Sequence, residues 1–333
     1  MSNPPTISVI VPTFNGAAFL GETLSSLLAQ TEPVHQVVVV DDGSTDGSAD
    51  LARTHPLAPN VVQQQNHGVA AARNVGTFAA TGDYVAFLDH DDLWAPARNA
   101  RLRGFLAGHD DCSALVTTCT GFFLAEDEQK LIEVGDQLHR HQRRIERGAS
   151  AIDLDLALPP EPTVLSQLTT TALLDGPPSV TASLVIRRDL LHQAGGFAPF
   201  ARSYDDYVAL LNISAFARID LVDEPTVLYR VHSGSTTMST DWPLRLLTGV
   251  AAVRHGGRVV GPDGRDPSAV PALLDDRRFY LHQLGALAQR STSGMLDSLA
   301  LVRLLGTSRG DRARATAILL RRWLAGRARR PHR

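Results

Sequence analysis

Cysteine and lysine are scarce in this chain of 333 residues. The two cysteines, Cys112 and Cys119, are too few for a disulfide framework, and their spacing fits no common zinc pattern. Lys130 is the only lysine. The sequence therefore argues against a disulfide-stapled or zinc-binding protein, and it excludes lysine-based catalysis unless Lys130 itself takes part.

Long apolar runs, a strong net charge and nucleotide-binding glycine loops are also missing. No apolar run approaches the roughly 18–20 residues that span a bilayer, and the opening residues, MSNPPT, lack the basic region and apolar core of a signal peptide. The net charge of -3 gives no reason to expect nucleic acid as a partner. No G-x-G-x-x-G follows the first predicted strand, and no Walker A loop occurs. We expect a cytoplasmic protein without a Rossmann dinucleotide site.

Apolar and polar stretches alternate over the first 95 residues in a way that predicts the order β-α-β-α-β-α-β. The strands are short, continuous apolar runs, as expected when helices cover both faces of a parallel sheet. The predicted strands are 7–11, 36–40, 61–62 and 84–88, and the predicted helices are 17–30, 44–52 and 68–80. With 44% hydrophobic and 20% charged residues, the chain is typical of a globular protein of one or two domains.

The remainder of the chain is more varied. Residues 125–178 are charged and then proline-rich, and we expect a variable insertion there. The other predicted elements are a helix at 97–106, a strand at 114–118, a strand, helix and Gly-Gly turn within 179–197, and two short strands around Pro225 within 219–231. Residues 243–333 are predicted to be mainly helical. Their arginine-rich end favours a solvated helix over contact with an anionic membrane.

Three of the predicted strands end in polar signatures, which are PTFN, DDGSTDG and DHDD. Ligands of such sheets bind beyond the carboxyl ends of the strands, so all three signatures should line one crevice. DDGSTDG resembles the start of an EF-hand loop only superficially, because Arg53 stands where the twelfth-position glutamate would be and a strand precedes the loop.

DHDD places three carboxylates within four positions, which costs free energy unless a cation offsets their repulsion. Asp89 and Asp91 are one residue apart, so both can reach one hard cation. Mg²⁺ and Mn²⁺ suit such oxygen ligands, with substrate phosphates completing the octahedron. Taken alone, the pattern also fits a solvated acidic loop, and its neighbours decide between the two interpretations.

Together with those neighbours, DHDD resembles the family 2 glycosyltransferases, which have the GT-A fold. The resemblance rests on SVIVPTFNGAAFLGETLSSLLAQ, VVVVDDGSTDGS, NHGVAAARNVG, GDYVAFLDHDD, GGF…SYDDYVALL and YRVHSGS, in the family's order and roughly its spacing. These motifs cover about residues 6–235. The resemblance implies an α/β fold of GT-A type, with a mostly parallel twisted sheet, helices on both faces and a C-terminal helical region.

The same resemblance implies a division of the chain into three parts. These are a nucleotide-sugar-binding half at 1–120, an acceptor-binding half with the insertion and the catalytic base at 121–240, and a C-terminal helical extension at 241–333.

Donor-binding roles are implied for the first two polar signatures and the helix that follows them. The residues expected along the nucleoside are Pro12, Thr13 and Phe14, with Asn15 nearby. Asp42 would accept a hydrogen bond from the base, which favours an N–H donor such as that of uracil or thymine. The alternative for Asp42 is a helix-capping aspartate. Arg73 would bind near the base or the diphosphate, and its alternative is a surface arginine on a helix.

Metal and diphosphate roles are implied at the third signature and at YRVHSGS. Asp91 would bind the metal directly, and Asp89 would face the ribose and the water shell of the metal. His90 occupies the family's variable middle position and is assigned no more than a backbone role in the donor site. His232 resembles the family histidine that helps to hold the diphosphate or the metal.

The general base is implied at Asp206, the second acid of the pair that the family writes E-D. A hydroxyl that attacks an anomeric carbon needs a carboxylate within hydrogen-bond reach to take its proton. Here the first acid is Asp205, which leaves open which of the two carboxylates faces the acceptor. The alternative is a helix N-terminal acid. Relatives often continue with a pattern like DLWLR, whereas this chain has YVALLNIS, so acceptor binding is expected to differ.

The sequence thus predicts a metal-dependent, inverting glycosyltransferase that moves a sugar from a UDP- or dTDP-sugar to a hydroxyl of a small molecule, peptide or glycan, with Mg²⁺ or Mn²⁺ as cofactor. Two alternatives remain. A sugar nucleotidyltransferase would also bind nucleotide, metal and phosphates, although PTFNGAAF lacks the basic glycine-rich loop of such enzymes. A non-catalytic module would bind the sugar nucleotide without transferring it.

Overall fold

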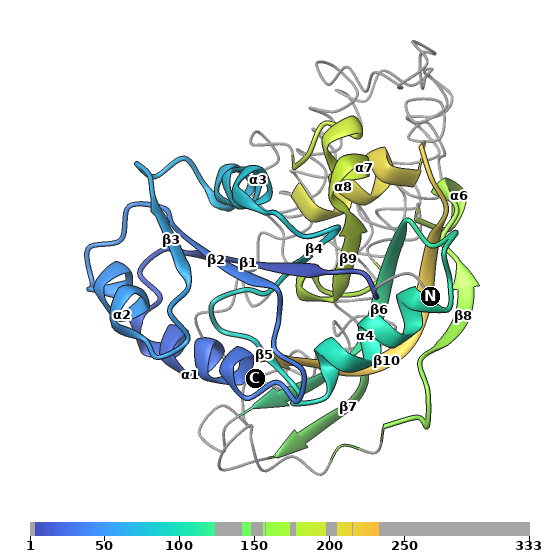
Figure 1. The fold of residues 1–333 in the computed structure, drawn as a ribbon, viewed down its shortest axis with the longest axis horizontal. Helices are drawn as coiled ribbons and strands as arrows, with labels where there is room; N and C mark the ends of the chain where they lie inside the picture. The colour runs from blue at the N-terminus through green and yellow to red at the C-terminus, as the bar shows by residue number, and fades with distance from the viewer. Residues whose placement is uncertain are drawn as a thin grey trace, which may run out of the picture.

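The computed structural model describes residues 4–123, 142–147, 156, 158–173, 178–197, 205–214 and 216–232 (Figure 1). The strands are β1 (Ile7–Thr13), β2 (Gln36–Asp41), β3 (Asn60–Gln63), β4 (Tyr84–Phe87), β5 (Leu93–Trp94), β6 (Ala114–Phe123), β7 (Gln142–Arg147), β8 (Thr163–Gln167), β9 (Leu184–Arg187) and β10 (Ile219–Arg230). The helices are α1 (Ala17–Leu28), α2 (Ser48–Thr54), α3 (Val69–Ala79), α4 (Arg98–Ala107), α6 (Thr170–Leu173), the 3₁₀ turn η4 (Thr181–Ser183), α7 (Arg188–Gln193) and α8 (Asp205–Ser214).

Within these residues the strands form one mixed sheet in the order β3-β2-β1-β4-β9-β6-β10-β5, with β7 beside β6 and β8 beside β10. Strands β3, β2, β1 and β4 are mutually parallel, as the alternation of strands and helices predicts. Strand β9 runs antiparallel to both β4 and β6 and joins this parallel half to the rest. The polar ends of β1, β2 and β4 therefore lie at one edge of the sheet.

Helices cover both faces of the sheet, because successive strand residues point to opposite sides. On β2, Val37 and Val39 pack in the cluster that contains residues of α1, α2 and α4, whereas Val38 and Val40 pack against α3. The helical residues of the first cluster are Leu20, Leu24, Leu27, Ala52, Leu102, Phe105 and Leu106. Val85 and Phe87 of β4 pack in a further cluster, which contains residues of α7 and α8.

Helix α3 approaches β1 closely. Gly76 faces Ile10, and a Cβ atom at position 76 would collide with the Ile10 side chain. The glycine thus allows the helix to lie near the strand whose end carries PTFN.

Two predicted elements differ from the structure. The helix expected from Ser44 begins only at Ser48, because the preceding residues form a loop with positive φ at Gly43 (82°) and Gly47 (87°). The two strands expected around Pro225 are one strand, β10. Its pairing with β6 shifts register between Val222 and Val227, and this irregularity accommodates the proline without ending the strand.

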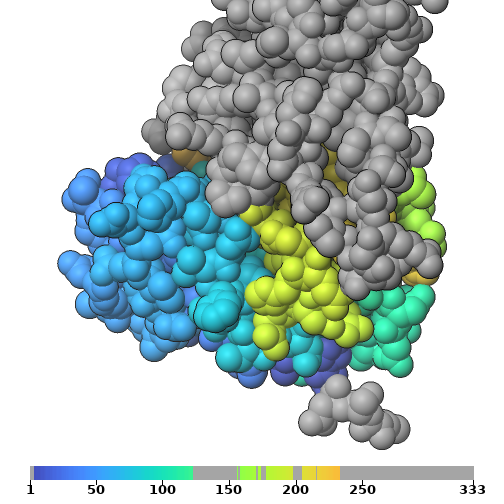
Figure 2. Space-filling view, turned by 90° about the horizontal axis from the view of Figure 1, so that it is seen from above, coloured from blue at the N-terminus to red at the C-terminus, as the bar shows by residue number. Residues whose placement is uncertain are grey.

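The strand, helix and Gly-Gly turn predicted within 179–197 are confirmed as β9, α7 and a turn. Gly195 and Gly196 have φ of 85° and 69° in this turn. In Figure 2 this yellow-green segment lies directly against the blue and cyan N-terminal segments. The contact includes two hydrogen bonds, since the side-chain amide of Asn74 donates to the carbonyl of Phe197 and accepts from its N–H, both at 2.8 Å.

Several predictions fall wholly or partly outside the described residues. These are the insertion at 125–178, the helical region at 243–333 and its arginine-rich end. The boundaries of the three predicted parts stay predictions. Among the residues that the structure describes, none of the helices combines the length and apolar character that crossing a membrane requires.

Candidate functional site

The loops after β1 and β2 are joined by side-chain hydrogen bonds. Asn15, at φ 51°, donates its N–H to Ser44 Oγ (2.9 Å), and its Oδ1 accepts from Thr45 N (2.9 Å). The first free N–H groups of helix α1 are bound from the same loop, because Gly16 N donates to Ser48 Oγ (3.0 Å) and Ala17 N donates to an Asp46 carboxylate oxygen (2.9 Å). The PTFN and DDGSTDG signatures thus form one rigid rim.

Three of the residues predicted along the nucleoside stand at the end of β1. Pro12 and Thr13 are buried, whereas the ring of Phe14 is 45% exposed. An exposed ring on a fixed loop is available for stacking, which suits the predicted role. Contact with a nucleoside stays a prediction for these residues and for Asn15.

Asp42 is buried at the end of β2 and binds the start of α3. One carboxylate oxygen accepts from Gln64 Nε2 (2.7 Å) and His67 N (2.9 Å), and the other accepts from Gly68 N (2.8 Å). These bonds resemble helix capping, which is the alternative role for Asp42. The helix that they cap is α3, which does not directly follow Asp42 in the chain. A carboxylate oxygen has two acceptor positions, so Oδ2 still has the capacity for the predicted base N–H.

Arg73 joins two predicted site carboxylates from helix α3. Its Nη1 lies 2.6 Å from Asp205 Oδ2, and its Nη2 lies 2.7 Å from Asp89 Oδ1. Burial alone lowers the pKa of Arg73, but Asp205 and Asp89 outweigh burial and hold the pKa above its usual value. The guanidinium is therefore a fixed cation between the β4 loop and helix α8. Contact of Arg73 with a donor stays a prediction.

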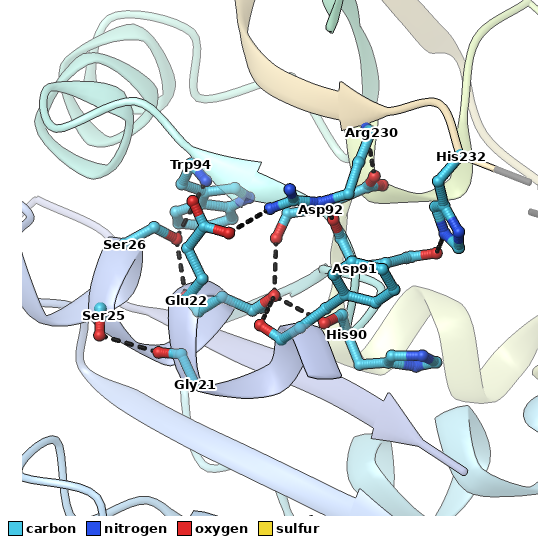
Figure 3. Close-up of polar contacts among 12 residues, drawn as sticks. Gly21, Glu22, Ser25, Ser26, His90, Asp91, Asp92, Trp94, Arg230 and His232 are labelled. Atoms are coloured by element: carbon cyan, nitrogen blue, oxygen red, sulfur yellow. Dashed lines mark hydrogen bonds and ion pairs between the residues drawn. The ribbon is translucent and has the colours of Figure 1, made fainter. Parts of the chain in front are cut away.

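Asp91 and His232 meet at the ends of β4 and β10, where Asp91 Oδ2 lies 3.0 Å from His232 Nε2 (Figure 3). Burial raises the pKa of Asp91, but the hydrogen bond with His232 and the charges of His90 and His232 together outweigh burial, so the pKa lies below its usual value. Asp91 is therefore a carboxylate at neutral pH. The aspartate follows β4 and the histidine follows β10, so residues that are far apart in the chain meet here.

The third carboxylate of DHDD, Asp92, differs from the other two. It is 1% exposed, and its Oδ1 accepts the N–H of Arg230 at 2.9 Å. Burial and the nearby charges of Asp91 and Asp89 raise the pKa of Asp92 well above its usual value. Asp92 thus fixes the loop from within the protein rather than facing a ligand.

His90 contacts helix α1 through its backbone and its ring, and its expected role in the donor site stays a prediction. Its carbonyl accepts from Thr23 Oγ1 at 2.7 Å, and Thr23 also donates to the carbonyl of Asp92 at 2.9 Å. The His90 ring lies against Gly16, where a Cβ would stand 2.5 Å from His90 Cδ2. Helix α1 therefore holds both the backbone and the side chain of His90.

The two acids at the start of α8 have different surroundings. Asp205 is 2% exposed, and burial, with Asp206 and Asp89 as neighbours, raises its pKa to about 6 against the lowering by Arg73. Asp206 is partly exposed, with Oδ2 accepting from Thr181 Oγ1 (2.5 Å) and Oδ1 from Tyr207 N (2.7 Å). Of the pair, only Asp206 offers its carboxylate to a molecule outside the protein.

The chemistry of Asp91 and His232 fits a divalent cation held by few protein ligands. Adjacent ligands in an octahedron with bonds of about 2.1 Å lie about 3 Å apart, and the facing atoms of Asp91 and His232 are 3.0 Å apart. Among the described residues, no three His, Cys, Asp or Glu side chains gather as a complete metal cluster. Mg²⁺ and Mn²⁺ sites of this kind take their remaining ligands from water and substrate phosphates.

Sequence reasoning missed two residues that shape this site. Thr181 donates to Asp206, and Arg230 contacts Asp91, Asp92 and Glu22. Arg230 is part of YRVHSGS, so the motif marked its position, but no local signal indicates that its partner is Glu22 on α1.

Known proteins share this fold and these motifs. Residues 8–151 match the family described as "Glycosyl transferase family 2". An uncharacterized glycosyltransferase, alr2836, of Nostoc sp. is 28% identical over 243 residues, which are 70% of this chain and 67% of that protein. In seven further curated relatives, each a glycosyltransferase by name, the match spans 37% or less of the relative.

Two solved structures extend the similarity of fold. S. aureus TarS 1-349 in complex with UDP-GlcNAc has a TM-score of 0.58 and 18% identity, covering 98% of this chain and 93% of that one. The mannosyltransferase PcManGT from Pyrobaculum calidifontis, in complex with GDP-Man and Mn2+, has a TM-score of 0.54 and 21% identity, covering 98% and 87%.

The fold and the comparisons define the class of protein, which is a glycosyltransferase. More particularly, residues 8–151 are similar to glycosyl transferase family 2, and the fold is of GT-A type. The predicted fold class is confirmed, with the sheet mixed beyond β4.

Proposed function

We propose that this protein transfers a sugar from a nucleoside-diphosphate sugar to a hydroxyl acceptor by a single, metal-assisted displacement with inversion. The observation that carries the proposal is the convergence of Asp89, Asp91, His232 and Asp206 at one edge of the sheet, linked by Arg73 through Asp205. Relatives named as glycosyltransferases and neighbours bound to UDP-GlcNAc or GDP-Man support it.

The donor would bind along the rim formed by the loops after β1 and β2. Phe14 offers an exposed ring, and Asp42 lies beneath the same edge with capacity for a base N–H. Because the two loops are already joined by hydrogen bonds, little ordering is needed when the nucleoside arrives. A UDP- or dTDP-sugar is favoured, since uracil and thymine carry the N–H that a carboxylate accepts.

The diphosphate would lie at Asp91 and His232. When bound there, Mg²⁺ or Mn²⁺ would supply positive charge that offsets the negative charge of the diphosphate leaving group. Asp91 would hold the cation with a carboxylate oxygen and His232 with an imidazole nitrogen, and Asp89 would face the water shell of the cation. Arg73 keeps Asp89 oriented through the 2.7 Å contact and balances part of the negative charge that the cluster carries without ligands.

Asp206 would be the general base. Its carboxylate takes the proton of the acceptor hydroxyl while that oxygen bonds to the anomeric carbon, and the bond to the diphosphate breaks with its electron pair leaving on the phosphate oxygen. Thr181 and the N–H of Tyr207 hold the carboxylate in one orientation, with an acceptor position left on each oxygen. Asp205 is buried against Arg73 and so is not placed to receive this proton.

A donor-binding and turnover screen tests the proposal. Melting temperatures would be measured with UDP-, dTDP- and GDP-sugars, each with and without Mn²⁺, because a ligand that binds only the folded state raises the melting temperature. We expect a rise for one sugar nucleotide that depends on Mn²⁺, followed by release of nucleoside diphosphate when hydroxyl acceptors are added.

Two other results would contradict the proposal. Formation of pyrophosphate from a nucleoside triphosphate and a sugar phosphate would assign the site to a sugar nucleotidyltransferase. Tight donor binding that Asp206→Asn leaves unchanged, with no turnover of any acceptor, would indicate a binding module.

A further inference from the structure

Arg230, the last residue of β10, has no role in the steps described above, yet it contacts Asp91 and Asp92 of the DHDD loop and Glu22 of α1. It is 3% exposed. Its backbone N–H donates to Asp92 Oδ1 (2.9 Å), its Nε donates to the carbonyl oxygen of Asp91 (2.8 Å), and its Nη2 donates to Glu22 Oε2 (2.5 Å). Figure 3 shows these contacts converging from β10, the DHDD loop and helix α1.

The guanidinium of Arg230 is enclosed by aromatic rings. Its central carbon lies 5.1 Å from the ring centroid of Phe19 on α1 and 4.7 Å from that of Phe122 on β6. Rings at these distances attract a cation and exclude water from it. The rings therefore shield the guanidinium, whereas the Glu22 side chain is 35% exposed, and the planar fork is held in one orientation.

The same contacts reach the predicted metal ligands. His232 lies two residues beyond Arg230, its ring centroid is 4.7 Å from that of Phe19, and its Nε2 faces Asp91. Phe19 thus packs against both Arg230 and His232. Asp91 is bound at two points, at its carbonyl by Arg230 and at its carboxylate by His232.

We propose that Arg230 is a positioning residue for the cation and diphosphate site. It fixes the backbone of Asp91 and the direction in which the chain leaves β10, so Asp91 and His232 face each other before any donor arrives. Glu22 and the two rings hold Arg230 in this arrangement. The inference rests on the proposed function, since it assigns a purpose to the geometry of that site.

A purely structural ion pair is the alternative, and the chain offers a matched control for it. Arg101 on α4 also pairs with a glutamate across two elements, donating to both carboxylate oxygens of Glu224 on β10 at 2.7 Å. Glu224 is fully buried. Among the described residues, Arg101 hydrogen-bonds to Glu224, Pro159 and Pro160 and not to the DHDD loop, so its loss should cost stability without changing the contacts of Asp91 and His232.

The first measurement is the Mn²⁺ dependence of UDP binding by calorimetry, together with the melting temperature, for the parent protein, Arg230→Gln, Arg230→Lys and Arg101→Gln. We expect Arg230→Gln to weaken Mn²⁺ by about tenfold or more, as loss of groups that orient metal ligands does. Arg230→Lys should restore part of the loss. Arg101→Gln should lower the melting temperature while leaving Mn²⁺ dependence unchanged. Equal Mn²⁺ dependence in Arg230→Gln and Arg101→Gln would overturn the proposal.

A second measurement needs no ligand. In ¹⁵N-histidine-labelled protein, the ring signals of His232 are identified by their loss in His232→Gln. We expect Arg230→Gln to move these signals and Arg101→Gln to leave them in place. If the parent binds no Mn²⁺ with UDP, the proposed function fails, and an unmoved His232 signal alone then overturns the role of Arg230.

Should Arg230→Gln not fold, Glu22→Gln replaces it in both measurements. This variant keeps the arginine and removes the charge that holds it, so a smaller change in the same direction is expected. No change in either measurement would contradict the proposal.

Discussion

Arg73 and Asp205 are 132 positions apart in the chain, yet the guanidinium of one lies 2.6 Å from the carboxylate of the other in the protein interior. The pair connects helix α3, which packs on β1 and β2, to helix α8, which carries Asp206. Removing one partner of a buried pair leaves the other charge uncompensated, and this is usually more costly than the pair itself is stabilising.

We therefore predict that Arg73→Gln lowers the free energy of unfolding by about 3–5 kcal/mol. Asp205→Asn in the Arg73→Gln background should recover part of this loss, because it removes the charge left behind. Urea denaturation of the two single variants and the double variant measures the coupling. Additive losses would show that the two residues do not interact.

Replacing the two acids of α8, one at a time, should have different effects on kcat. Asp206→Asn is expected to keep donor affinity and to lower kcat by about 10²–10⁴, the usual contribution of a general base. Asp205→Asn keeps an acceptor for Arg73 and should lose stability while retaining most of kcat. Single-turnover rates and donor titrations of both variants test this. The reverse order of effects on kcat would place the base at Asp205.

Asp91→Ala should remove the Mn²⁺-dependent rise in melting temperature with donor and should abolish transfer. The reason is that Asp91 supplies the carboxylate nearest to His232. Asp50→Ala is the matched control, because Asp50 is an exposed aspartate of α2 that pairs with Arg53 on the surface. Full turnover by Asp91→Ala in EDTA would exclude the metal role.

The hydrogen bonds of Asp83 should make the free energy of unfolding depend on pH. The N–H and hydroxyl of Thr6 donate to this carboxylate at 2.8 and 2.7 Å, and they hold its pKa below the usual value. A lowered folded-state pKa gives stability that is present above the unfolded pKa and is lost as pH falls through the folded pKa. Asp83→Asn should cost about 1 kcal/mol at pH 7, a figure reduced for solvent exposure. The difference from the parent should vanish in acid, and a constant difference across pH in denaturation would contradict this.

Two glycines in helices should respond in opposite directions. Gly76→Ala is expected to cost about 1–3 kcal/mol, because its Cβ would collide with Ile10 on β1. Gly104→Ala on α4 meets no atom within 4 Å and should stabilise the protein by up to about 1 kcal/mol. Thermal unfolding of both variants measures the contrast, and similar effects would show that α3 can move away from β1.

The sequence could predict the parts of the candidate site that stand directly after the ends of strands. Asp91 and His232 belong to motifs after separate strands, and the sheet brings them within 3.0 Å, as a common edge requires. The sequence did not predict which distant side chains pair beneath the site. Arg73 with Asp205 and Arg230 with Glu22, 208 positions apart, depend on packing of whole helices and not on local pattern. Pro225 misled the strand prediction because a register shift absorbs it.

The amide of Asn74 holds both the N–H and the carbonyl of Phe197, one residue beyond a turn whose Gly196 would clash with Asn74 if it bore a side chain. These two bonds tie Phe197 and the turn before it to α3, so a displacement of the turn would act on α3. Under the proposed function, a substitution in this turn would therefore also affect donor binding through α3, and changes of acceptor preference should be easier to obtain elsewhere.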